Sequence, residues 1–165
     1  IYGRLQLHHF TRLEMKIALF PGSFDPITLG HENIIHRALP LFDKIIIGIG
    51  INSEKKSLFP IEHRIQFIEQ CLGNNPKIEI CSYDDLTGKF CQKNGIKFLI
   101  RGIRNSIDFQ YENDIARANK EIFGIETIFF ATDGECAHIS SSLVREIYCN
   151  EGEYQRYIPK DVILR

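Results

Sequence analysis

The chain has 165 residues, of which 44% are hydrophobic and 25% are charged, and its formal net charge is -1. This size fits one domain with a sizeable core, and the composition excludes a disordered chain. No apolar run approaches the roughly 18 residues of a membrane span, and a charge so close to zero does not attract polyanions, so we expect neither a membrane nor a nucleic-acid partner.

Residues 1–14 differ from the rest of the chain, because they show no clear hydrophobic period and end just before Met15, the single methionine. We interpret this segment as a leader, either added for expression or translated from upstream, and we place a single domain at residues 15–165. A native extra strand or helix is the alternative interpretation of residues 1–14.

Strand and helix patterns alternate from Met15 onward. A short apolar run predicts a strand at residues 15–20, which Pro21 and Gly22 close, and apolar residues at helical spacing predict a helix over 30–41. The unbroken β-branched run at 44–51 is typical of a strand that is buried on both faces.

The alternation continues to the C-terminal part of the chain. The patterns predict, in chain order, a helix at 61–72, a strand at 77–83, a helix at 86–93, a strand at 98–100, a helix at 108–123, a strand at 126–131 and a helix at 141–149. This order predicts an α/β fold, a Rossmann-like doubly wound sheet of five parallel strands with helices on both faces. Ligands of such sheets bind beyond the carboxyl ends of the strands, so the loops there are where a site is expected.

The loop after the first strand reads PGSFDPITLGH, residues 21–31. Gly22 lets the backbone approach a ligand, Ser23 offers a hydroxyl and an amide, and His31 lies at the start of a helix. The positive potential of a helix N-terminus keeps an imidazole neutral near pH 7 and attracts anions. A neutral imidazole N–H beside free amides stabilises charge that develops on phosphorus, which predicts a nucleotidyl-transfer site. Alone, His31 would be interpreted as a surface or capping histidine.

Three more loops at the same edge carry groups that bind phosphate. They are Lys55 after the second strand, Arg101 and Arg104 after the fourth, and Ser140, Ser141 and Ser142 at the start of the last helix. Each has a plainer interpretation, since the lysine could be solvated and the serines could only cap the helix. The arginines could pair with Asp108 or Glu112. Their shared position at one sheet edge favours ligand binding.

Other patterns do not indicate a metal or dinucleotide site. His31 and His36 are five residues apart, roughly 140° around a helix, whereas a zinc protease motif needs four. Gly48 and Gly50 lack the third glycine of a dinucleotide fingerprint, and we interpret them as close-packing positions in a strand. The five cysteines show no CxxC spacing, which favours reduced thiols in a cytoplasmic protein.

The whole set of motifs resembles the nucleotidyltransferase superfamily that shares an (H/T)xGH signature and, within it, the bacterial phosphopantetheine adenylyltransferases. The resemblance rests on PGSFDPITLGH, SEKK, FLIRGIRNSIDFQYE and ISSSLVR, and it extends from Met15 to about residue 159. It implies that ATP and 4′-phosphopantetheine react to give dephospho-coenzyme A and pyrophosphate, a late step of coenzyme A biosynthesis. It further implies Mg²⁺ that arrives with ATP and has no protein side-chain ligand, and a homohexamer.

The resemblance also assigns roles to matching positions. His31, Lys55 and Ser23 would be catalytic, His31 by stabilising the α-phosphoryl group, and the substrate would be bound by Ser23, Lys55, Thr87 and Arg101. ATP would be held by Ser23, Phe24, His31, Gly102, Ile103, Arg104, Glu112, Cys136, Ala137, His138, Ile139, Ser140, Ser141 and Ser142.

Two other functions remain open at this point. One is another nucleotidyltransferase of the superfamily, which would act on nicotinamide mononucleotide or glycerol phosphate. The other is a module that binds ATP without turnover, although such a module would be expected to lose His31, Lys55 or Arg101, and all three are present.

Overall fold

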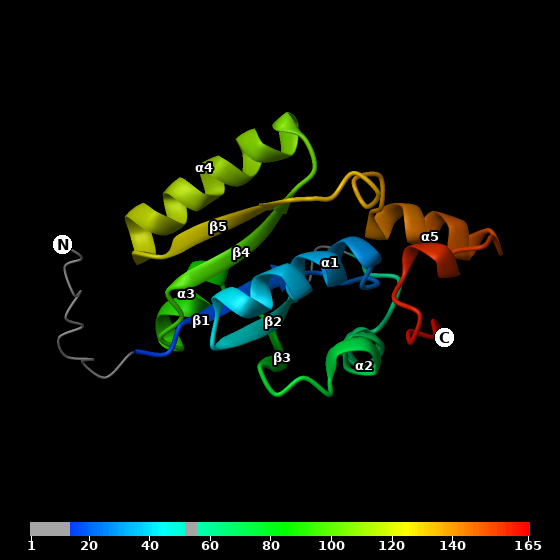
Figure 1. Cartoon of the computed structure of the whole chain (residues 1–165), viewed down its shortest axis with the longest axis horizontal. Coiled ribbons are helices and arrows are strands. Elements are labelled where there is room, and N and C mark those ends of the chain that lie inside the picture. Colours follow the sequence, from blue (N-terminus) through cyan, green and yellow to red (C-terminus); the bar gives the residue numbers. More distant parts are fainter. Residues whose placement is uncertain (1–13, 52–55) are drawn as a thin grey trace, which may run out of the picture.

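A computed structural model describes residues 14–51 and 56–165 of the chain (Figure 1). Within these residues, five parallel strands form one sheet in the order β3-β2-β1-β4-β5. Their bounds are β1 (Ile17–Gly22), β2 (Lys44–Gly50), β3 (Ile78–Tyr83), β4 (Phe98–Ile103) and β5 (Glu126–Ala131). The predicted Rossmann-like α/β fold is confirmed, with the strand order reversing between β1 and β4.

Helices cover both faces of this sheet (Figure 1). They are α1 (Leu29–Ala38), α2 (Ile61–Leu72), α3 (Thr87–Lys93), α4 (Ser106–Phe123) and α5 (Ser141–Cys149), with short 3₁₀ turns at Leu39–Leu41 and Gln155–Tyr157. The larger apolar cluster joins β1 and β2 to α1, α2, α5 and the C-terminal segment. The smaller cluster joins the opposite face of the sheet to α3 and the end of α4. None of the helices in the described part of the chain is long and apolar enough to cross a membrane.

The hydrophobic pattern of the central strands explains the two-faced core. In β2, Ile45, Ile47 and Ile49 are fully buried in the larger cluster, whereas Ile46 belongs to the smaller one. A strand turns successive side chains to opposite faces, so an unbroken apolar run is what two covered faces require.

Two strands extend further than the sequence patterns predict. β1 includes Pro21 and Gly22, and β4 continues past Ile100 to Ile103, because its backbone stays paired with β5 up to the Ile103–Ala131 register. The prediction ended this strand at Ile100 because the apolar run stops at the charged Arg101. The hydrogen bonds between neighbouring strands join backbone groups, so they continue past a charged side chain. Arg101 and Gly102 therefore lie within a strand and not in the loop after it.

Two helix boundaries differ from the prediction by two residues or more. α1 ends at Ala38 and passes into the 3₁₀ turn that contains Pro40. α4 begins at Ser106, earlier than the predicted 108, because the Asn105 side chain accepts hydrogen bonds from the Ile107 and Asp108 amides at 3.0 and 2.9 Å. The Asn105 cap thus satisfies two backbone amides in the first turn of α4.

Close packing at Gly48 is confirmed, whereas Gly50 is less crowded. A Cβ at Gly48 would lie 2.7 Å from Leu19 Cδ1 and 2.9 Å from Tyr83 Cε1, and both side chains are buried. The Tyr83 ring cannot move freely, since it stacks on Phe90 at 4.6 Å. A Cβ at Gly50 would meet only ordinary contacts at 3.6 Å and beyond.

We therefore expect Gly48→Ala to lower the free energy of unfolding by about 1–3 kcal/mol, the usual cost of overpacking a core. Gly50→Ala, two residues along the same strand, is the matched control and should cost clearly less. Urea denaturation of both variants measures the difference, and equal effects would contradict the packing argument.

Candidate active site

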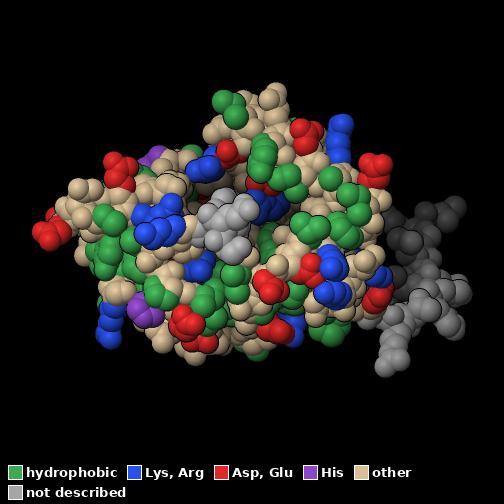
Figure 2. Space-filling model, turned by 180° about the vertical axis from the view of Figure 1, so that it is seen from behind, with side chains coloured by type: hydrophobic (Ala, Val, Ile, Leu, Met, Phe, Trp, Pro, Cys, Tyr) green, Lys and Arg blue, Asp and Glu red, His purple; other side chains and the backbone are tan. Residues whose placement is uncertain are grey.

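A cavity of about 320 Å³ opens at the carboxyl ends of β1 and β4, between the starts of α1 and α5. Many residues predicted for the site line it together: Ser23, His31, Arg101, Gly102, Arg104, Glu112, Cys136, Ile139, Ser140 and Ser141. On the face shown in Figure 2, lysine and arginine side chains gather around a hollowed region. The predicted sheet edge is therefore where the structure brings the polar groups together.

The cavity exists because β1 and β4 separate. Their described backbone pairing covers only Ala18–Phe98 and Leu19–Leu99, although both strands continue beyond these residues. Past that point, Arg101 Nη1 donates to the Pro21 carbonyl at 2.9 Å. A side chain thus bridges two strands whose backbones no longer pair, and Gly22 and Ser23 are left facing the opening.

His31 is held by the N-terminal cap of its own helix. The Thr28 amide donates to His31 Nδ1 at 3.1 Å, the Thr28 hydroxyl lies 3.0 Å from the same nitrogen, and the Thr28 hydroxyl accepts from the His31 amide at 3.5 Å. Because Nδ1 accepts a backbone hydrogen bond, the proton of the neutral ring lies on Nε2. Nε2–H is therefore the donor available to a ligand in the cavity.

The imidazole is neutral at physiological pH, as predicted, but the main cause is different from the one expected. The pKa of His31 is lowered to about 4, mainly because the ring is buried and also because the positive charges of Arg101 and Arg104 oppose its protonation. The ring lies 5.0 Å from the Phe24 ring and 6.1 Å from the Phe20 ring, measured between centroids. This apolar contact explains the desolvation that opposes protonation.

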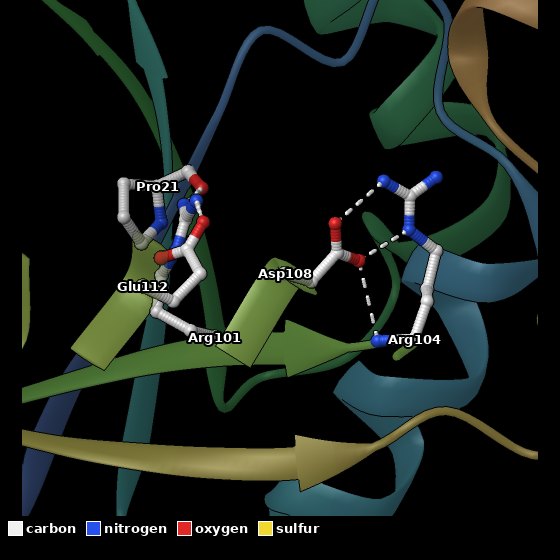
Figure 3. A network of polar contacts seen from close by, with 5 residues as sticks. All are labelled: Pro21, Arg101, Arg104, Asp108 and Glu112. Carbon is white, nitrogen blue, oxygen red and sulfur yellow. Dashed lines mark hydrogen bonds and ion pairs between the residues drawn. The ribbon is translucent and has the colours of Figure 1, made fainter. Parts of the chain in front are cut away.

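Arg101 lies within β4 and Arg104 directly follows it, and each is paired with a carboxylate of α4 (Figure 3). Arg101 Nε donates to Glu112 Oε2 at 2.7 Å, and its Nη2 contacts Glu112 Oε1. Arg104 Nε donates to Asp108 Oδ2 at 2.9 Å. The ion pairs considered in the sequence analysis therefore occur, yet all four side chains also line the cavity. The pairing holds each guanidinium in place where a phosphate could reach it.

The three serines at the start of α5, of which Ser140 is the N-cap, use their hydroxyls within the protein. Ser140 caps the helix by accepting from the Leu143 amide at 3.1 Å, and Ser141 Oγ donates to the Pro26 carbonyl at 2.8 Å. Ser142 accepts from Arg145 Nη2 at 3.1 Å. Because these serine hydroxyls are engaged, the backbone amides at the start of α5 are better candidates for binding an anion.

A smaller cavity of about 150 Å³ adjoins the first. The two share Pro21, Arg101 and Glu112 in their walls. Thr87, which was predicted to bind substrate, lines the smaller cavity, and its hydroxyl is 2.9 Å from the Tyr83 hydroxyl. The cavity is otherwise lined mainly by apolar and neutral polar residues: Leu99, Ile115, Ala116, Asn119 and Thr127.

Not every predicted residue lines the cavities. Phe24 is buried below His31, and Ser142 faces Arg145. His138 is exposed and packs its ring against Tyr157 at 6.0 Å. Ile103 and Ala137 are half-buried neighbours of lining residues. Lys55 falls outside the described residues.

Sequence reasoning missed two residues that shape the site. No role was assigned to Thr28, although a threonine three positions before its partner has the spacing of a capping box. Arg64 lies on α2 with 6% exposure, and its Nη1 donates to the Ser23 carbonyl at 2.8 Å. No local pattern marks this second contact, because it depends on where α2 packs.

Comparisons with known proteins agree with this arrangement. The cytidylyltransferase-like family model matches residues 19–147. A relative from Flavobacterium psychrophilum is 47% identical over 148 residues, which cover 90% of this chain and 98% of the relative. A relative from Cytophaga hutchinsonii is 48% identical over 145 residues, which cover 87% and 97%. Both relatives are named phosphopantetheine adenylyltransferase.

Among solved structures, a bifunctional NMN adenylyltransferase/ADP ribose pyrophosphatase from Francisella tularensis is similar, with a TM-score of 0.69. The match covers 88% of this chain but only 45% of that one, at 19% sequence identity, and therefore shows a shared fold alone. The family model and the close relatives together decide the membership: this chain belongs to the cytidylyltransferase-like nucleotidyltransferases and, among them, to the phosphopantetheine adenylyltransferase family.

Proposed function

We propose that this chain transfers the adenylyl group of ATP to 4′-phosphopantetheine, which yields dephospho-coenzyme A and pyrophosphate. The observation that carries the proposal is the convergence of a neutral imidazole donor, two guanidinium groups and the start of α5 on one cavity. Relatives that share 41–48% of their residues and bear the corresponding name favour this acceptor over nicotinamide mononucleotide.

The chemistry needs no nucleophile from the protein. An oxygen of the acceptor phosphate forms a bond to the α-phosphorus of ATP, and the bond from that phosphorus to the bridging oxygen breaks, so that pyrophosphate leaves with the electron pair. Catalysis then depends on alignment and on stabilising charge at phosphorus. In our proposal, His31 Nε2–H donates to an α-phosphoryl oxygen, and Arg101 and Arg104 balance the remaining negative charge.

The two adjoining cavities fit two substrates. We assign the larger cavity to ATP and the smaller to the pantetheine arm, whose amides and methyl groups suit the neutral walls around Thr87. Arg101 borders both cavities, which suits a group that binds the phosphate at the junction. We retain Lys55 as a proposed partner of that phosphate.

We further propose that Mg²⁺ enters with the nucleotide. In residues 14–51 and 56–165, no three His, Cys, Asp or Glu side chains gather as metal ligands, and the two carboxylates of the cavity are engaged with arginines. Mg²⁺ keeps much of its water and binds readily through nucleotide phosphates, so the ATP oxygens would be its main ligands and it would neutralise their charge. This fits a cavity built of cationic and amide donors.

The proposal includes assembly as a homohexamer in the cytoplasm. Along α4, Ile107, Tyr111, Ile115 and Ile122 form an exposed apolar stripe on one side of the helix; we call it the α4 stripe. Apolar surfaces of this kind mark contacts between proteins. The five cysteines are free thiols, as in proteins of a reducing compartment.

Pyrophosphate release from ATP and Mg²⁺ should depend on 4′-phosphopantetheine, with dephospho-coenzyme A detected by mass spectrometry. Chelation of Mg²⁺ should stop the release and its re-addition should restore it. Turnover with nicotinamide mononucleotide in place of phosphopantetheine would contradict the proposed acceptor, and ATP binding without release under any condition would contradict an enzymatic role.

His31→Ala should lower kcat about 100-fold or more, the usual effect of removing a donor to a developing oxyanion, with little change in the KM for ATP. His36→Ala, on the exposed side of the same helix, is the control and should keep wild-type kinetics. A wild-type kcat in folded His31→Ala protein would remove His31 from the proposed role.

The ionisation of His31 gives a second measurement on the same residue. Its folded pKa of about 4 lies below the ordinary 6.5, so the unfolded chain binds more protons in this range and the stability from this group is lost as pH falls from 6.5 toward 4. The His31 ring signals in NMR should titrate near pH 4, and His31→Ala should lack this part of the pH dependence of unfolding. A midpoint near 6.5 would contradict the buried, neutral ring.

Light scattering should give a mass six times the 19.1 kDa of one chain. Ile122→Glu, in the α4 stripe, should reduce that mass, whereas Gln66→Glu adds the same charge on the exposed side of α2 and should leave it unchanged. A single-chain mass for the wild type would contradict the hexamer, and an unchanged mass for Ile122→Glu would exclude the stripe from the contact.

A further inference from the structure

Asp25 is a buried carboxylate with no assigned role, and it is absent from the described walls of both cavities. The residue is 4% exposed. Its Oδ1 accepts from the Phe59 amide and its Oδ2 from the Leu58 amide, both at 2.9 Å. A buried carboxylate is unfavourable unless its oxygens are satisfied, so this pair of amide contacts fixes the segment before α2 against the turn after β1.

The same residue is tied to α5. Arg145 Nη1 donates to the Asp25 carbonyl at 2.6 Å and lies 3.7 Å from Asp25 Oδ2. Ser141 adds a parallel contact, since its hydroxyl donates to the Pro26 carbonyl at 2.8 Å. Asp25 therefore lies where three segments meet: the turn after β1, the segment before α2, and the helix whose start lines the ATP cavity.

The turn that Asp25 ends has an unusual backbone. Phe24 has φ 45°, a left-handed conformation that non-glycine residues adopt only when their surroundings enforce it. Its ring contacts the His31 ring, and the preceding Ser23 carbonyl is held by Arg64. Contacts on both sides of Phe24 thus fix the direction of Ser23 and the packing below His31.

We propose, on the basis of the proposed function, that Asp25 is a positioning residue: it holds the Ser23–Phe24 turn, the segment before α2 and α5 in one arrangement, so that acceptor and ATP meet in line beside His31. Asp25 touches no substrate in this proposal. It acts through Phe24, whose position sets the surroundings of the imidazole, and through Arg145, which fixes α5.

The test is a double-mutant cycle on kcat with Asp25→Asn and His31→Ala. Asn keeps the shape but cannot accept from both amides without turning an NH₂ group toward one of them, and it loses the charge that faces Arg145. We expect Asp25→Asn to lower kcat about 30-fold in the wild-type background and less than about threefold when His31 is already alanine. The substitution acts by misaligning the contact between His31 and the substrate, and the His31→Ala protein has no such contact to lose.

Asp43→Asn is the matched control. The exposed Asp43 Oδ2 also accepts a backbone amide from a distant residue, Lys16, at 2.8 Å, but it lies at the opposite end of the sheet, where β2 begins. Asp43→Asn should leave kcat unchanged in both the wild-type and the His31→Ala backgrounds. Loss of folded protein lowers kcat equally in both backgrounds, so equal losses from Asp25→Asn would overturn the positioning role, as would a wild-type kcat.

A second variant covers the case in which Asp25→Asn does not fold. Arg145→Met removes the α5 side of the same contact and should show the same dependence on the His31 background. An equal loss in both backgrounds, or no loss, would overturn the proposal in that case.

Amide hydrogen exchange separates this inference from the proposed acceptor. ATP bound at the start of α5 should slow exchange of the Leu58 and Phe59 amides in the wild type but not in Asp25→Asn, whether or not phosphopantetheine is the acceptor. If the wild type releases no pyrophosphate but shows this ATP effect, the acceptor is wrong and Asp25 still couples the segments. Exchange that ATP does not alter in the wild type would overturn the coupling.

Discussion

The separation of β1 from β4 is the constraint on which the site depends. These strands lie side by side at the centre of the sheet, where the strand order reverses, and their described pairing ends after two residue pairs. Chains that leave a sheet on either side of such a reversal move apart and leave a crevice. Arg101, which we propose binds phosphate, bridges the crevice by donating to the Pro21 carbonyl, so one hydrogen bond joins the central strands to this side chain.

Among the described residues, the arginines at the crevice are already paired with carboxylates. Arg101 and Arg104 are each paired with a carboxylate of α4, whereas His31 is kept neutral by burial. A phosphate that enters therefore joins existing ion pairs and does not meet two unpaired cations. This arrangement limits the cost of holding like charges together and keeps the guanidinium groups oriented, which is the preorganisation that electrostatic catalysis needs.

Much of the fold and the site edge could be predicted from the sequence, because local patterns determined both. The β-branched run of β2 and the string from Pro21 to His31 depend on neighbours in the chain alone. The misses have a common physical origin in contacts between distant segments. β4 continues through Arg101 because β5 pairs with it, and Arg64 is buried because α2 packs near Ser23. Strand order and helix packing set these contacts, and neither can be predicted from the local patterns of a single sequence.

The exposed α4 stripe affects the solubility of the chain differently from its folding stability. α4 has no fully buried residue among its 18, while its cap, its ion pairs and the packing of Phe123 hold it on the sheet. The apolar stripe therefore adds little to the stability of an isolated chain, but it leaves apolar surface in contact with water. A single chain can be well folded and still expose this apolar surface, so substitutions that raise its melting temperature will not by themselves keep it in solution.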